Sequence, residues 1–310
     1  MKSNKIFFIH RGNSWYLKYT LSQMHYFNPE CEIILLGDQS NNKYDFVSHY
    51  DISDYSQGID DFASVYKHLS PNGYSYEIFC FQRWIVLRNF VKTHKIEGGF
   101  FYFDSDVLIF SNIQEIISTF KLDDFDLTVS HEESPHCLFF HDLQILQKFI
   151  DYLFKLYTEE KLLQKLVEHY ENRKNDGTLQ TLGGVSDMTA FYNFSKCSDT
   201  NVLDITKIIV DKKACDHNVN VSDGYKINEV LNMKKIKFLH EADDLVPYCI
   251  EEKSNELIRF LLIHFQGSAK RLVTDYYLGK KFRISAFFNL RSPIKKVFSL
   301  KRYIFNKKRT

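Results

Sequence analysis

Asp104 and Asp106, two positions apart behind an apolar run, are the residues of this chain best suited to chemistry. The segment from Phe100 to Phe110 reads FFYFDSDVLIF, which is typical of a buried strand. Because side chains alternate along a strand, both carboxylates are expected on one face, with Ser105 turned back toward the sheet. Two like charges beside a dry strand are costly unless a cation or hydrogen-bond donors compensate them. The pattern favours a site for Mn²⁺ or Mg²⁺ over its alternative, an Asp-rich turn without a ligand.

A second polar group follows the apolar run RFLLI and reads HFQGSAK, from His264 to Lys270. The imidazole of His264 could supply the nitrogen that two carboxylates lack for a complete cation site. Gly267 would let the backbone approach a phosphate, and Lys270 would meet that phosphate as a point charge. Alone, a histidine at a strand end is more often structural. Together with the two aspartates, the motif indicates a bound cation next to groups that bind a diphosphate. A nucleoside diphosphate that leaves during a reaction needs both, because they stabilise its growing negative charge.

These motifs resemble those of GT-A fold glycosyltransferases, and most closely the bacterial enzymes related to glycosyltransferase family 8. The shared features are an N-terminal strand followed by a polar turn, a D-x-D after a strand, and a C-terminal H-F-x-G-x-x-K. The resemblance spans about residues 5 to 270. It implies that Asp104, Asp106 and His264 ligate the metal, and that Gly267 and Lys270 contact the diphosphate.

The resemblance also implies a donor contact for Arg83, in the segment FCFQRW. The chain departs from the family pattern after Lys270, where Arg271 and Leu272 replace a proline and a tryptophan. Whether transfer retains or inverts the anomeric centre is therefore left open by the sequence.

A third group lies at Gly183, Gly184, Ser186 and Asp187. A glycine pair lets backbone crowd a sugar, and Ser186 is expected to cap a helix that begins at Asp187. Asp187 resembles the acidic residue that GT-A enzymes hold near the sugar or acceptor. If transfer inverts the anomeric centre, Asp187 is the candidate base; if transfer retains it, Asp187 is expected to orient the sugar. The alternative is that Asp187 has no role in transfer and only stabilises the start of the helix through the helix macrodipole.

The exit of the first strand is the expected place for the nucleotide, because ligands of such folds bind at the carboxyl ends of parallel strands. The residues expected to contact the donor there are Ile9, His10, Arg11 and Asn13. Ser105 of the D-x-D is expected to contact the donor as well.

Alternating strands and helices predict an α/β chain with a Rossmann-like, mixed and mostly parallel sheet flanked by helices. The first strand, the first helix and the second strand are expected at 5–10, 15–27 and 32–36. Further helices are expected at 59–69, 76–93, 113–120 and about 141–172. One transferase domain is expected over residues 1–275, followed by a basic helical tail over residues 276–310.

Charge is distributed unevenly along the chain. Residues 280–310 hold 11 of the 40 Lys and Arg residues and none of the 39 Asp and Glu residues. Basic pairs interleaved with aromatic residues suit a helix lying on an anionic membrane surface. Nucleic-acid binding and a merely disordered tail are the alternatives, and no nucleic-acid partner is expected.

The compartment is expected to be the cytoplasm, with the protein peripheral on the inner face of the cell membrane. The six cysteines form no C-x-x-C pair, and the start of the chain lacks the apolar core of a signal peptide. No apolar run reaches the length needed to span a bilayer.

The expected function is metal-dependent transfer of a sugar, with a UDP-sugar as the expected donor, to a cell-surface glycan such as lipopolysaccharide or to a lipid-linked acceptor. One alternative is a haloacid-dehalogenase-like phosphatase, whose D-x-D-x-[TV] signature Asp104, Asp106 and Val107 match. Another is a membrane-attached protein that binds a nucleotide-sugar without turnover.

Overall fold

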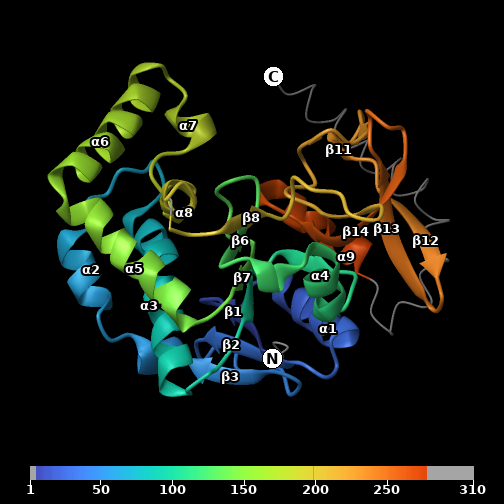
Figure 1. Ribbon diagram of the computed structural model, residues 1–310, viewed down its shortest axis with the longest axis horizontal. Coiled ribbons are helices and arrows are strands. Elements are labelled where there is room, and N and C mark those ends of the chain that lie inside the picture. Colours follow the sequence, from blue (N-terminus) through green and yellow to red (C-terminus); the bar gives the residue numbers. More distant parts are fainter. Residues whose placement is uncertain (1–4, 198, 278–310) are drawn as a thin grey trace, which may run out of the picture.

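A seven-stranded sheet forms the centre of the molecule in the computed structural model, which describes residues 5–197 and 199–277. Its strand order is β3-β2-β1-β4-β7-β6-β8, and β7 alone runs antiparallel to both of its neighbours. The predicted mixed, mostly parallel sheet flanked by helices is therefore confirmed (Figure 1). The strands are β1 (Lys5–Ile9), β2 (Glu32–Gly37), β3 (Ser48–Asp51), β4 (Phe100–Phe103), β6 (Leu127–Val129), β7 (Cys137–Phe140) and β8 (Val202–Asp204).

Helices cover both faces of this sheet, because alternate side chains of the apolar strands point to opposite sides. Phe7 and Phe100 pack with α3 and α5, whereas Phe8 and Phe101 pack with α1 and α4. The helices are α1 (Leu17–Phe27), α2 (Ile59–Val65), α3 (Tyr74–Thr93), α4 (Ile113–Phe120), α5 (Leu143–Thr158), α6 (Glu160–Asn175), α7 (Leu179–Leu182), α8 (Asp187–Ser195) and α9 (Val273–Tyr276). Short 3₁₀ helices are η1 (Ile52–Tyr55), η2 (Leu122–Asp124) and η3 (Gly267–Leu272).

A smaller antiparallel sheet stands beside the first, in the order β12-β13-β14-β5, with β9 parallel to β14. Pairing of β14 with β5 sets His264 opposite Val107. The end of β14 is thereby fixed next to the residue that follows Asp106. The strands are β5 (Val107–Ile109), β9 (Lys213–Cys215), β12 (Lys237–Glu241), β13 (Asp244–Ile250) and β14 (Leu257–His264), with a separate hairpin of β10 (Ile227–Asn228) and β11 (Met233–Lys234).

The apolar run from 100 to 110 is not the single strand that the sequence suggested. It forms β4 in the large sheet and β5 in the small one, and the segment Asp104–Asp106 is the turn between them. Strand alternation is therefore the wrong reason for the convergence of the two carboxylates. The turn itself, held by a 3.2 Å hydrogen bond from Val107 N to Asp104 O, brings them together.

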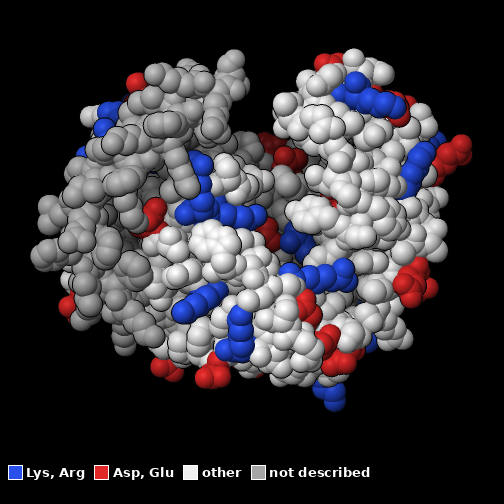
Figure 2. Space-filling view, turned by 180° about the vertical axis from the view of Figure 1, so that it is seen from behind, with Lys and Arg blue, Asp and Glu red and all other residues white. Residues whose placement is uncertain are grey.

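The long helix expected over about 141–172 is also wrong in detail, since it is two helices. The backbone of Glu159 is extended, at ψ 116°, and separates α5 from α6. The outward part, α6 with α7, stands away from the sheet, and Figure 2 shows the surface hollowed beside this lobe.

No helix in the described residues is long and apolar enough to cross a membrane. All six cysteines are free. The basic tail predicted for residues 276–310 lies outside the described residues from 278 onward, so its helical character and membrane contact stay predictions.

Candidate metal centre

Asp104, Asp106 and His264 meet where the β4–β5 turn touches the end of β14. One ligand atom from each side chain lies within 4.8 Å of the others. The backbone locks the two segments together, because Phe265 N donates a 3.0 Å hydrogen bond to Asp106 O. Residues far apart in the sequence are thus held as one group by sheet pairing.

Asp106 is the buried centre of this group, with 6% of its surface exposed. Its Oδ2 lies 3.0 Å from Lys270 Nζ, and its Oδ1 lies 3.4 Å from His264 Nε2. Burial would raise the pKa of Asp106, but the charges of His264 and Lys270 hold that pKa at about 2. Burial opposes charge on His264 as well, and the neighbouring Asp106 nevertheless raises its pKa. The carboxylate is therefore ionised and available as a ligand.

His264 presents a defined nitrogen to this centre. Its Nδ1 lies 2.7 Å from the carbonyl oxygen of His217, which requires a proton on that nitrogen. The raised pKa of His264 favours a second proton on Nε2, facing Asp106. A cation bound here would take the place of that proton, so Nε2 is the nitrogen that can ligate a metal. His136 stacks on the ring at 4.1 Å between centroids, and burial lowers the pKa of His136, so that this neighbour is neutral.

Arg83 from α3 bridges the metal group to Asp187. Its guanidinium donates to Asp104 Oδ1 at 2.8 Å and to Asp187 Oδ2 at 2.6 Å. Tyr102 donates to the same Asp104 oxygen at 2.7 Å, and Trp84 donates to Asp187 at 3.1 Å. No hydrogen bond within the described residues reaches Asp104 Oδ2, so that oxygen can serve a ligand.

Asp187 begins α8, as predicted, but its side chain is buried with 3% of the residue exposed. Burial raises its pKa, while Arg83 opposes that effect. Ser186 is the N-cap residue, and its backbone N–H donates to Thr189 Oγ1 at 3.3 Å. Since both described partners of Asp187 are donors from α3, its geometry suits positioning of Arg83.

The two glycines before α8 differ in their surroundings. A Cβ on Gly184 would come within 2.3 Å of Leu69 O, so this glycine is required by close packing of the protein's own backbone. A Cβ on Gly183 would meet nothing within 4 Å, and the φ of Gly183 is 75°. Only Gly183 leaves open space for a sugar, and contact with one stays a prediction.

The exit of β1 lies against the D-x-D turn. His10 Nδ1 is 2.9 Å from Ser105 Oγ, so Ser105 faces this exit and does not turn back toward the sheet. Arg11 is exposed and lies over the ring of Phe79, 3.8 Å from its centroid. Asn13 accepts a hydrogen bond from Tyr44 at 3.3 Å. Polar groups from β1 and from the turn thus line one edge, as expected for a ligand at the ends of parallel strands.

Ile9 differs from the other residues predicted at this exit. Its side chain is 6% exposed and packs in the core, so only its backbone could contact a donor. Asp38, which follows β2, fixes the exit by accepting hydrogen bonds from Gly12 N and Ser40 N at 2.5 and 2.8 Å.

Gly267 and Lys270 lie on η3, directly after β14. Gly267 has φ 58°, and a Cβ added there would meet nothing within 4 Å, so its backbone is open to a ligand. Lys270 also lies over the ring of Tyr16, 5.7 Å from the centroid. Burial opposes the charge on Lys270, but Asp106 raises its pKa, so the side chain is an ammonium group.

Four contributing residues were missed by sequence reasoning: Tyr16, Trp84, Tyr102 and His136. Tyr102 was detectable as the only hydroxyl in the apolar run before the D-x-D. Trp84 adjoins Arg83 in the sequence, although its indole contact with Asp187 depends on packing between α3 and α8. No local signal marks the other two.

The donor set fits a divalent cation. Two carboxylates and one imidazole suit Mn²⁺, and the oxygens alone suit Mg²⁺. Three carboxylates, Asp104, Asp106 and Asp187, face the permanent cations of Arg83 and Lys270. With His264 neutral, as a metal ligand must be, one negative charge is left in excess, and an added cation would compensate it.

Comparison with known proteins gives distant structural neighbours that are glycosyltransferases. No family model and no curated protein sequence matches the chain. Mouse xyloside xylosyltransferase 1 is 12% identical, with a TM-score of 0.44 over 68% of this chain and 87% of its own. The galactosyltransferase LgtC, solved with donor and acceptor sugar analogues, is 14% identical, with a TM-score of 0.45 over 90% and 99%.

Proposed function

We propose that the protein is a metal-dependent glycosyltransferase that moves a sugar from a nucleotide-sugar, with UDP as the nucleotide, to a glycan or lipid-linked acceptor. The observation that carries the proposal is the convergence of Asp104, Asp106 and His264 beside Lys270. A diphosphate leaving group needs such a combination of cation and fixed positive charge. An acceptor in cell-surface polysaccharide synthesis is part of the proposal.

The metal residues would be Asp106, Asp104 through its Oδ2, and His264 through its Nε2. A bound Mn²⁺ or Mg²⁺ supplies Lewis-acid stabilisation of the departing diphosphate. Lys270 adds a fixed positive charge, and the open backbone at Gly267 lets a phosphate approach η3. Backbone pairing holds these groups together, so little reorganisation is needed when charge develops.

Arg83 and Asp187 are proposed to keep the D-x-D turn in its binding conformation. Arg83 holds one oxygen of Asp104 and leaves the other for the cation. Asp187 orients that guanidinium through its 2.6 Å contact. This arrangement gives Asp187 a positioning role toward Arg83 and argues against its being the base of an inverting reaction.

Donor turnover tests the proposal directly. The full-length protein with Mn²⁺ is expected to release UDP from a UDP-sugar, and a chelator is expected to stop the release. The same preparation is offered simple phosphate esters. Phosphatase activity on those esters without nucleotide affinity would support the haloacid-dehalogenase alternative. Calorimetric binding of UDP-sugars without turnover on any acceptor would support the binding protein instead.

The basic tail is proposed to attach the enzyme to the inner face of the cell membrane, where a lipid-linked acceptor is found. Deletion of residues 281–310 removes 10 of the basic residues counted above. We expect the truncated protein to hydrolyse donor at the full-length rate but to lose sedimentation with anionic liposomes, because the attraction scales with the number of Lys and Arg near the surface. Neutral liposomes are the control. Equal binding of both proteins to anionic liposomes would refute the anchor.

A further inference from the structure

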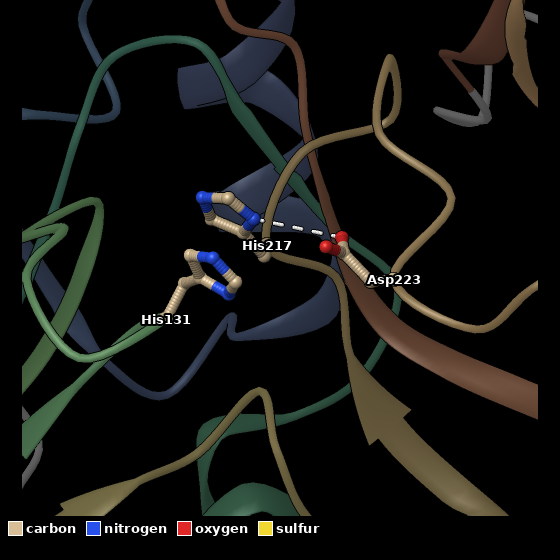
Figure 3. A group of neighbouring side chains, drawn as sticks. All are labelled: His131, His217 and Asp223. Carbon is tan, nitrogen blue, oxygen red and sulfur yellow. Dashed lines mark ion pairs between the residues drawn. The ribbon is translucent and has the colours of Figure 1, made fainter. Parts of the chain in front are cut away.

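We propose a second cation site, formed by His131, His217 and Asp223, that takes a transition-metal ion such as Zn²⁺. One ligand atom from each side chain lies within 4.8 Å of the others. His217 Nδ1 is 3.5 Å from Asp223 Oδ2, and the imidazole rings of His131 and His217 are stacked on each other (Figure 3). The three residues come from different segments, namely the turn between β6 and β7, the chain after β9 and the loop before β10. The proposal does not depend on sugar transfer.

His217 carries a buried nitrogen that makes no hydrogen bond among the described residues and faces a carboxylate oxygen of Asp223 at 3.5 Å. Its Nδ1 has no hydrogen-bond partner within the described part of the chain, and its side chain is 13% exposed. A buried polar atom without a partner costs stability, so such an atom needs an explanation. A metal ion bound at this nitrogen provides one.

His131 can complete the site by a side-chain rotation. The rings of His131 and His217 stack at 4.2 Å with 11° between their planes, so their nitrogens do not yet point to one position. Tetrahedral Zn²⁺ with bonds of about 2.0–2.1 Å places its ligand atoms about 3.4 Å apart. The His131 ring is exposed and makes no hydrogen bond among the described residues, whereas its backbone N–H is held by Asp204 and Thr206 at 3.0 and 2.8 Å. The ring can therefore close on an ion while its backbone stays in place.

Charges beside the cluster also favour a cation. Asp216 and Asp223 both bind the single ammonium group of Lys234, each at 2.7 Å, which leaves one negative charge in excess. Lys234 Nζ and His217 Nδ1 both face Oδ2 of Asp223, and no hydrogen bond among the described residues reaches Oδ1, which is therefore the oxygen left for an ion. Two imidazoles and one carboxylate suit Zn²⁺, Co²⁺, Ni²⁺ or Cu²⁺ better than Mg²⁺.

An ion at the second site would stabilise the candidate metal centre indirectly, through His217. The carbonyl oxygen of His217 accepts the hydrogen bond that orients His264, and His136 lies between the two rings, 4.1 Å from His264 and 6.2 Å from His217. An ion that fixes His217 would fix the segment on which the His264 tautomer depends. Its role is structural, as an outer support for a metal ligand.

The proposal is tested by measuring Co²⁺ binding to the full-length protein after a chelator has removed any bound metal. An Asp106→Asn variant is used as the background, so that the candidate metal centre is disabled and turnover plays no part. We expect one equivalent of Co²⁺ to give the visible absorption of a four-coordinate ion, and Zn²⁺ to displace it. In the same background, His217→Ala and His131→Asn are each expected to weaken binding at least tenfold. Asparagine suits position 131, where φ is 50°.

The matched control is His141→Asn. His141 Nδ1 lies 3.5 Å from Asp142 Oδ2, the same distance as in the His217–Asp223 pair, but no third donor joins it in the described residues. Binding should be unchanged in this variant. Absence of Co²⁺ absorption in the background protein, or binding that both substitutions leave intact, would overturn the proposal. If His217→Ala fails to fold, the exposed His131→Asn decides the outcome.

Discussion

Replacing Asp106 by asparagine is expected to lower Mn²⁺-dependent UDP release at least about a hundredfold. The substitution keeps the shape of the side chain but removes the charge that both His264 and Lys270 contact. The cation would lose its most buried carboxylate ligand, and Lys270 would lose the partner that holds it beside the diphosphate position. UDP release at saturating donor and metal is the measurement, with Mn²⁺ affinity measured by calorimetry on the same samples.

A matched control for this variant is Asp151→Asn on α5. Asp151 is exposed, and its described hydrogen bond comes from Gln147 in the preceding turn, at 2.7 Å. Its substitution should leave both rate and metal affinity unchanged. Full Mn²⁺-dependent turnover in Asp106→Asn, with a native circular dichroism spectrum, would remove the metal assignment.

Replacing Lys234 by methionine is expected to lower the free energy of unfolding by about 3–5 kcal/mol. The Lys234 side chain is 1% exposed and its partner Asp216 is 0% exposed, so the substitution leaves a buried carboxylate without a counter-charge. Asp216 also accepts a hydrogen bond from the backbone N–H of His264 at 3.2 Å. The substitution is therefore expected to disturb the position of His264 as well. Urea unfolding followed by circular dichroism measures the loss.

Two variants control for the loss of a lysine as such. Lys212→Met breaks an ion pair with Glu256 in which the side chains are 65% and 47% exposed, and it should cost less than about 1 kcal/mol. The double substitution Lys234→Met with Asp216→Asn removes both charges and should recover part of the loss. Equal unfolding free energies for Lys234→Met and Lys212→Met would contradict the buried ion pair.

The strand-end motifs could be located from sequence because each follows a strongly apolar run. Asp104 and Asp106 after one run and His264 after another are brought together by pairing of β5 with β14, which no local pattern specifies. The change of sheet inside the segment 100–110 was not predictable, since both halves are buried strands and read alike. The sequence therefore indicated which residue types could bind a cation, but not the strand pairing that brings them together.

Other parts of the site depend on contacts between distant helices. The structure pairs Arg83 with Asp187 through packing of α3 and α8, which the sequence did not indicate. The expected contacts of Arg83 with a donor and of Asp187 with a sugar stay predictions. The break at Glu159 also has no local signal, because no glycine or proline interrupts the pattern there. His131 and His217 stand in the sequence as single histidines in loops, and only the fold sets them face to face.

Backbone pairing between β5 and β14 has a consequence for how this protein could diversify. The distance from carboxylate to imidazole depends on the alignment of two short strands, and a slip of two residues would displace one side chain by about 6.6 Å. The α6/α7 lobe, which lies in the chain between these strands, pairs with neither of them. Insertions or deletions within the α6/α7 lobe can therefore change the outer surface of the molecule while the spacing of the candidate metal ligands is kept.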